Sequence, residues 1–169
     1  MTGYNLEGWG DLFVAAAGAT AALSGLIFVG LSVNLHAVLE LDRRAGDNLL
    51  TGRAIEALVA LLDVLVISLV ALTPTIDPGV LAGFILLTAI SSAISPTRAA
   101  MAARNQGSLT TRTAWRIGLA IAVTSTLVAA GITLAAGHGG GLDWLPIAFV
   151  LSITVAAINA WVLLVEILR

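Results

Sequence analysis

The chain has 169 residues, of which 59% are hydrophobic and 11% charged, and its formal net charge is −2. Its mean hydropathy is +1.02. Soluble domains are about a quarter charged, so this composition excludes a surface in contact with water and predicts one that faces lipid. Cysteine is absent, which excludes disulfides, thiol catalysis and iron–sulfur ligation.

Apolar runs of about twenty residues, the length of a membrane-crossing helix, recur along the chain. There are five, at about 12–39, 53–73, 79–102, 115–136 and 144–167. They predict an all-α fold: one transmembrane domain over residues 1–169, built as an integral membrane bundle of five helices. The first eleven residues hold two acids and no basic residue, unlike a cleaved signal peptide, so the first run is expected to remain as a helix.

The arginines lie in alternate connections of this arrangement. Seven flank the first and third connections and one ends the chain: Arg43, Arg44, Arg53, Arg98, Arg104, Arg112, Arg116 and Arg169. The second and fourth connections contain none. Because cytoplasmic loops carry an excess of basic residues, we expect the N-terminus outside and the C-terminus in the cytoplasm.

The first run contains small residues at helical spacing. They are Gly18, Ala22, Gly25 and Ser32. Small residues let helix backbones approach closely, so this face predicts helix packing. Packing within the bundle is the more common role, and an oligomer contact or a pore-lining helix are the alternatives.

The second run places an acid, Asp63, near its middle, with Glu56 seven residues earlier on the same helical face. An acid exposed to lipid costs at least a few kcal/mol, so this face is predicted to point into protein or water. Glu56 lies closer to the cytoplasmic interface, where an acid is more often an interface residue or an arginine partner.

The third and fifth runs carry polar stripes that are expected to meet Asp63 in one interior seam. The stripe of the third run is Thr88, Ser91, Ser92 and Ser95, and that of the fifth is Ser152, Asn159 and Glu166. Asn159 is predicted at about the depth of Asp63. Arg98 is expected within reach of Glu56, Glu166 or the lipid headgroups.

Two interpretations of this seam stay open. In the first, it is a hydrated path or an ion or proton site centred on Asp63. In the second, it is a hydrogen-bonded cluster that fixes helix register, with Asp63 protonated or paired to Arg98.

Other classes of function lack the residues they need. The two histidines, His36 and His138, fall on opposite sides of the membrane and cannot readily share one haem, and they are too few for a histidine-based metal cage. No nucleotide-binding, zinc-protease or serine-hydrolase motif occurs. Topology explains the arginines, which lack the aromatic platforms of nucleic-acid binding. We therefore expect no enzyme, no cofactor, no metal and no nucleic-acid partner.

Two stretches, "AGATAALSGLIFVGLSVNL" and "GRAIEALVALLDVLVISLVALTP", resemble a group of small bacterial polytopic membrane proteins. The resemblance covers about the first 75 residues. It implies a multi-pass protein of the bacterial cytoplasmic (inner) membrane and no particular activity.

Two functions are compatible with these patterns. The first is a homo-oligomeric channel or transporter for cations or protons that uses Asp63 and the polar seam. The alternative is a non-catalytic accessory or regulatory subunit of a larger membrane complex. In both, the lipid bilayer is the surrounding partner.

Overall fold

In this computed structural model, the described residues are 6–45, 49–106, 111–137 and 140–167, and all their regular structure is helical. A 3-10 helix, η1 (Leu6–Trp9), leads into five α-helices. These are α1 (Gly10–Ala45), α2 (Leu49–Ala71), α3 (Pro78–Gln106), α4 (Thr111–Ala135) and α5 (Trp144–Ile167). The predicted all-α fold with five helices is confirmed, although α1 continues past its predicted end at residue 39.

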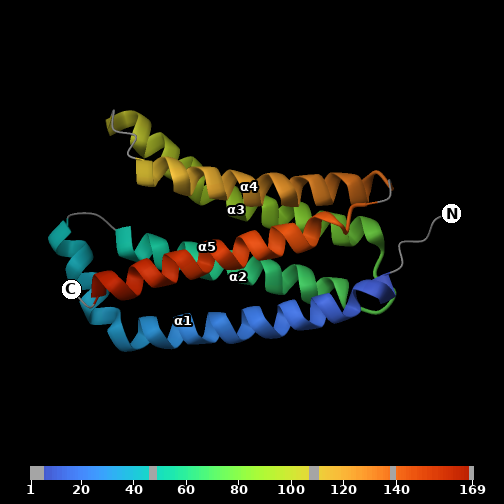
Figure 1. Ribbon diagram of the computed structural model, residues 1–169, viewed down its shortest axis with the longest axis horizontal. Coiled ribbons are helices and arrows are strands. Elements are labelled where there is room, and N and C mark those ends of the chain that lie inside the picture. The colour runs from blue at the N-terminus through green and yellow to red at the C-terminus, as the bar shows by residue number, and fades with distance from the viewer. Residues whose placement is uncertain (1–5, 46–48, 107–110, 138–139, 168–169) are drawn as a thin grey trace.

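The five helices run side by side along the long axis of the molecule (Figure 1). α3 and α4 form a hairpin on one side, α1 lies on the other, and α2 and α5 lie between them. The end of α1, the start of α2, the end of α3 and the start of α4 all lie at one end of the bundle. We call this the arginine end, because Arg43, Arg44, Arg53 and Arg116 belong to these helix ends.

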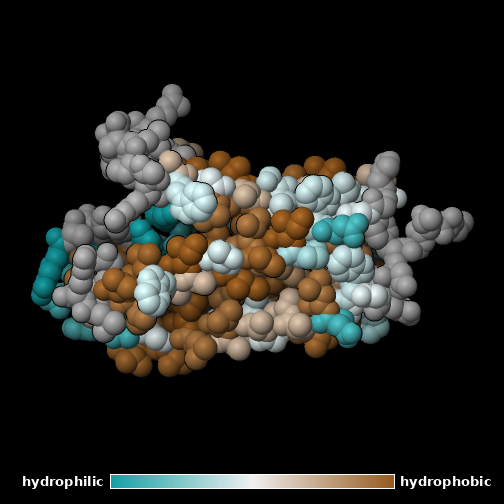
Figure 2. Space-filling view, in the orientation of Figure 1, coloured by the Kyte–Doolittle hydropathy of each residue, from teal (hydrophilic) through white to brown (hydrophobic). Residues whose placement is uncertain are grey.

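The surface of the bundle is apolar over most of its length. Four helical segments are long and apolar enough to cross a membrane: Gly10–Arg44, Leu50–Ala71, Ala114–Ala135 and Trp144–Val165. The apolar segment of α3, Pro78–Ile94, is shorter. Large side chains such as those of Leu26 and Val33 are exposed. On the face in Figure 2, hydrophobic residues cover the middle and hydrophilic ones gather toward the ends, as expected for a membrane protein.

Aspartate side chains cap the starts of two helices. At α3, Asp77 Oδ1 accepts the backbone N–H groups of Gly79 at 2.8 Å and Val80 at 3.3 Å. Pro78 takes the first helical position, where its missing N–H does no harm. The apolar run that begins after Asp77 therefore becomes a helix at the expected place.

The cap of α2 comes from a different helix. Asp42, near the end of α1, accepts the backbone N–H groups of Leu50 at 2.9 Å and Thr51 at 3.0 Å, and the hydroxyl of Thr51 at 2.6 Å. Its side chain is buried. This carboxylate satisfies donors that an isolated helix start leaves unpaired, and it ties α1 to α2 at the arginine end.

Apolar packing is distributed unevenly along the bundle. The largest buried cluster lies away from the arginine end and joins all five helices, with members that include Phe13, Ile67, Ile85, Leu127 and Leu145. Two smaller clusters lie nearer the arginine end, and their buried members come from α1, α2 and α5: Val38, Leu50, Ala54 and Leu163 in one, and Ala57, Leu61 and Ala156 in the other. Toward the arginine end, the α3–α4 hairpin therefore contributes no buried member to these apolar clusters within the described residues.

Candidate functional site

Asp63 is the most central acid of the bundle. It lies on α2 about 21 Å from the start of a helix about 35 Å long, and its side chain is only 8% exposed. Ser91 Oγ of α3 lies 2.7 Å from Asp63 Oδ1 and 2.9 Å from Oδ2, and Ser92 Oγ lies 2.6 Å from Oδ2. Two neighbouring serines of α3 thus hold the carboxyl group from the same side.

No cation contacts this carboxyl group within the described residues. Both hydrogen-bond partners of Asp63 are neutral hydroxyls. An uncompensated charge buried in a low-dielectric interior costs several kcal/mol. Asp63 can avoid this cost in two ways. Its carboxyl group can be protonated and therefore neutral, or it can be ionised with one small cation bound to it.

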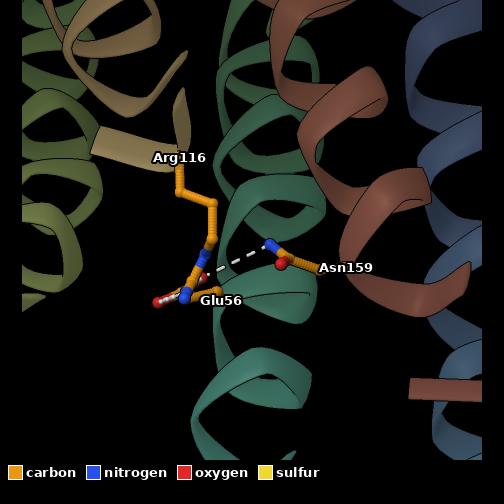
Figure 3. A network of polar contacts seen from close by, with 3 residues as sticks. All are labelled: Glu56, Arg116 and Asn159. Carbon is orange, nitrogen blue, oxygen red and sulfur yellow. Dashed lines mark hydrogen bonds and ion pairs between the residues drawn. The ribbon is translucent and has the colours of Figure 1, made fainter. Parts of the chain in front are cut away.

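The second acid of α2, Glu56, has a different environment (Figure 3). Arg116 of α4 donates from Nη2 to Glu56 Oε2 at 2.7 Å and to Oε1 at 2.9 Å. Asn159 of α5 donates from Nδ2 to Glu56 Oε2 at 3.4 Å. The ion pair joins α2 to α4, and the hydrogen bond from Asn159 adds α5. These contacts lie toward the arginine end, where the described apolar clusters have no buried member from the α3–α4 hairpin.

Asn159 lies with Glu56 and not, as expected, at the depth of Asp63. The reason is where the helices begin and end: α2 starts at Leu49 and α5 stops at Ile167. At 1.5 Å per residue, Glu56 lies about 10 Å from the start of α2 and Asn159 about 12 Å from the end of α5. The single polar seam predicted from the sequence is therefore two separate polar sites along α2, one at Glu56 and one at Asp63.

The structure brings together only part of the predicted seam. Ser91 contacts Asp63, whereas Ser152 is buried on α5 and makes no described hydrogen bond to Asp63. The side chains of Ser95, Arg98 and Glu166 lie outside the described residues. Sequence reasoning placed Arg98 within reach of Glu56, Glu166 or the headgroups and missed Arg116, although Arg116 stands in the first turns of α4, at a level where it can reach Glu56.

The small residues of α1 lie on the outside of the bundle. Gly18, Ala22, Gly25 and Ser32 are all exposed, and no described atom comes within 4 Å of a Cβ built on Gly18 or Gly25. This differs from the expected packing within the bundle, because α1 turns another face inward. That buried face carries Phe13, Ala16, Thr20 and Val38.

Several more hydroxyl groups are enclosed by the helices. The Oγ atoms of Ser24 and Ser68 and the Oγ1 atom of Thr124 are buried and have no hydrogen-bond partner in the described structure. Buried polar atoms without a protein partner commonly bind water. These positions, on α1, α2 and α4, are therefore candidate hydration sites inside the bundle.

The donor set around Asp63 is composed of oxygen atoms. They are the two carboxyl oxygens and the two serine hydroxyls that contact them. The backbone carbonyl oxygen of Thr88 lies behind one of these hydroxyls, 2.9 Å from Ser91 Oγ. Among the described residues, no three His, Cys, Asp or Glu side chains lie together as a metal site would require. One carboxylate balances one positive charge, so the set is matched to a singly charged cation or a proton.

In comparisons with protein-family models, with curated proteins and with solved structures, no match to this chain was found. The resemblance of the first 75 residues to small bacterial polytopic proteins stays a prediction. Function is therefore inferred from the geometry of the site.

Proposed function

We propose that this protein moves cations or protons across the bacterial inner membrane, as a channel or transporter in which Asp63 is part of the path. The single observation that carries this proposal is the environment of Asp63. A carboxyl group that is 8% exposed sits deep in an apolar bundle and is bound by neutral hydroxyls only, within the described residues. Intramembrane acids in such settings commonly mark ion paths or proton relays.

The proposal includes five membrane crossings. α3 is 29 residues long, about 43 Å, and lies alongside helices that are apolar enough to span. The arginine end is proposed to face the cytoplasm by the positive-inside rule. The N-terminus then lies outside and the C-terminus inside.

Several copies of the chain are proposed to assemble around the path. Five helices are few for a wide internal conduit, and α1 exposes most of its apolar length together with Gly18, Ala22, Gly25 and Ser32. Close approach of small residues is a common mode of helix association in lipid. A homo-oligomer with α1 at its contacts is therefore the assembly that accompanies this function.

The first experiment measures cation and proton flux in liposomes that contain purified wild-type protein or the Asp63→Asn variant. We expect flux in the wild type and a decrease of at least about tenfold in the variant, equivalent to a barrier higher by about 1.4 kcal/mol. The matched control is Asp11→Asn, which removes an exposed aspartate at the start of α1 and should leave flux unchanged. Equal flux from well-folded wild type and Asp63→Asn would remove Asp63 from the path.

A second candidate function is an accessory subunit that packs against a larger membrane complex. The observation that favours it is the exposed face of α1, where Leu26 is 69% and Val33 77% exposed on the isolated chain. Such a face suits another membrane protein as well as it suits a second copy. A stable oligomer of this chain alone, with measurable flux, would count against the accessory role, and negligible flux together with a stable complex with other subunits would favour it.

A further inference from the structure

The hydroxyl of Ser91 has more acceptors within reach than it has hydrogens. Its Oγ lies 2.7 Å from Asp63 Oδ1, 2.9 Å from Asp63 Oδ2 and 2.9 Å from the backbone carbonyl oxygen of Thr88. A hydroxyl donates one hydrogen bond and accepts others. Ser91 therefore has two arrangements: it donates to Asp63, or it donates to Thr88 and accepts a hydrogen bond from Asp63.

Ser92 lacks this choice among the described contacts. Its Oγ lies 2.6 Å from Asp63 Oδ2, and that is its described hydrogen bond. Ser92 thus acts as a donor to Oδ2 whether the carboxyl group is charged or neutral. Because Oδ2 accepts from Ser92 and Ser91 can act as an acceptor, Oδ1 is the oxygen that can carry a proton and donate it to Ser91.

Other charged and titratable side chains of the described structure lie toward the two ends of the bundle. At the arginine end they are His36, Glu40, Asp42, Arg43 and Arg44 of α1, Arg53 and Glu56 of α2, and Arg116 of α4. At the opposite end they are Asp11, Asp77 and Asp143. The described side chains of α3 and α5 contribute none, and no described contact joins any of these groups to Asp63, so its charge state is coupled most directly to the two serines.

We propose that Asp63 is a proton-binding site and that Ser91 is the hydrogen-bond switch that serves both of its protonation states. In the protonated state, Asp63 Oδ1–H donates to Ser91 Oγ, and Ser91 donates to the Thr88 carbonyl. On release, the Oδ1–H bond breaks and the proton passes to a water molecule, which becomes hydronium. The Ser91 hydroxyl then rotates to donate to the carboxylate, so no heavy atom has to move.

This inference rests on the proposed function and deepens it, because it names the proton as the ion of the same site. It also explains why two serines lie side by side at one carboxyl group. Ser92 holds the carbonyl oxygen Oδ2 in both states, and Ser91 changes its direction with the proton. A permanently ionised acid would need donors only.

The test is infrared difference spectroscopy of the protein in lipid, recorded between acidic and alkaline pH in choline chloride. We expect a C=O stretching band of a protonated carboxylic acid in the wild type and its loss in Asp63→Asn. The exposed-site control Asp11→Asn should keep the band. Absence of any band that Asp63→Asn removes would overturn the assignment of a proton site.

Two serine variants test the switch itself. Ser92→Ala should move the band to higher frequency, because the carbonyl oxygen loses its donor. Ser91→Ala should leave the band close to its wild-type position, because Ser91 does not donate to Asp63 in the protonated state. An equal upward shift in both variants would overturn the switch. Ser91→Cys, whose thiol is a weak hydrogen-bonding group of similar size, provides the same comparison if Ser91→Ala fails to fold.

The ion and the transport role are separated by two further measurements. Loss of the band when sodium chloride replaces choline chloride at constant pH would show that sodium displaces the proton from Asp63, and it would overturn the inference that the proton alone is the ion of this site. A band with the expected behaviour but no flux in liposomes would keep the proton site and defeat the transport proposal. Flux that depends on Asp63, without an infrared band that Asp63→Asn removes, would support the transport proposal and overturn the proton site.

Discussion

Glu56 and Asp63 lie on the same helix and the same helical face, seven residues apart, yet their environments differ. Glu56 is paired with Arg116, has Asn159 beside it, and keeps 21% of its side chain exposed. Asp63 is 8% exposed and is bound by Ser91 and Ser92. One acid is neutralised by a fixed cation, and the other is held by hydroxyls that suit either charge state.

The difference indicates separate roles for the two levels of α2. A salt bridge between α2 and α4 fastens the α3–α4 hairpin at the arginine end, where the described apolar clusters draw on α1, α2 and α5 only. The carboxyl group deeper in the bundle also bonds α2 to α3, through Ser91 and Ser92, but apolar packing toward that end already joins all five helices. We therefore expect Glu56 to contribute mainly to stability and Asp63 to have the transport role proposed above.

The largest effect on stability is expected from Arg116→Ala. Removing the arginine leaves Glu56 partly buried without its described cation, which should lower the free energy of unfolding by about 1–3 kcal/mol, less than for a fully buried pair because both side chains are partly exposed. Unfolding of the purified protein in detergent measures this loss. The double variant Glu56→Gln/Arg116→Gln should recover part of it, and failure to do so would show that the ion pair is not the cause.

An intermediate effect on stability is expected from Asp42→Ala. Like Glu56, Asp42 has a structural role, as the cap of α2. Asp42 accepts three hydrogen bonds at the start of α2, and loss of a helix cap costs about 0.5–2 kcal/mol. The same unfolding assay measures it, and flux per folded molecule should not change. Glu40→Ala serves as the matched control, because Glu40 is exposed and contacts Arg44 one turn away; an equal loss in both variants would argue against the cap.

The smallest effect on stability is expected from Asp63→Asn, the variant with the largest expected effect on flux. An asparagine amide can donate to Ser91 and accept from Ser92, as the protonated acid does, so unfolding should change by less than about 1 kcal/mol. This outcome would sharpen the contrast with Glu56. A loss as large as that of Arg116→Ala would instead place Asp63 among the structural contacts, and the division between the two levels would fail.

Much of the fold could be predicted because helix length and lipid exposure leave clear marks in a sequence. The five apolar runs became five helices, and α3 begins at Pro78, one residue before its predicted start. The four serines and threonines of the third run were predicted to face Asp63, and two of them are its hydrogen-bond partners. These features are local, or they depend on a repeat along one helix.

The pairing between helices was predicted less well. Arg98 was the only arginine predicted to be within reach of Glu56, with Glu166 and the headgroups as alternatives, and Asn159 was expected at the depth of Asp63. In the structure, Arg116 and Asn159 both lie at Glu56. A shift of a few residues in where α2 starts changes the level of every side chain on it by several ångströms. Sequence periodicity gives the face of a helix and says little about its height against its neighbours.

The sequence by itself determined that this is a helical membrane protein with an acid deep in its second helix, because hydropathy and periodicity are properties of single segments. Only the tertiary structure decided which acid meets an arginine and which meets two hydroxyls. It also decided that the small residues of α1 face outward, since that depends on which side of α1 packs on α2. Such choices follow from the relative height and rotation of packed helices, which no single segment encodes.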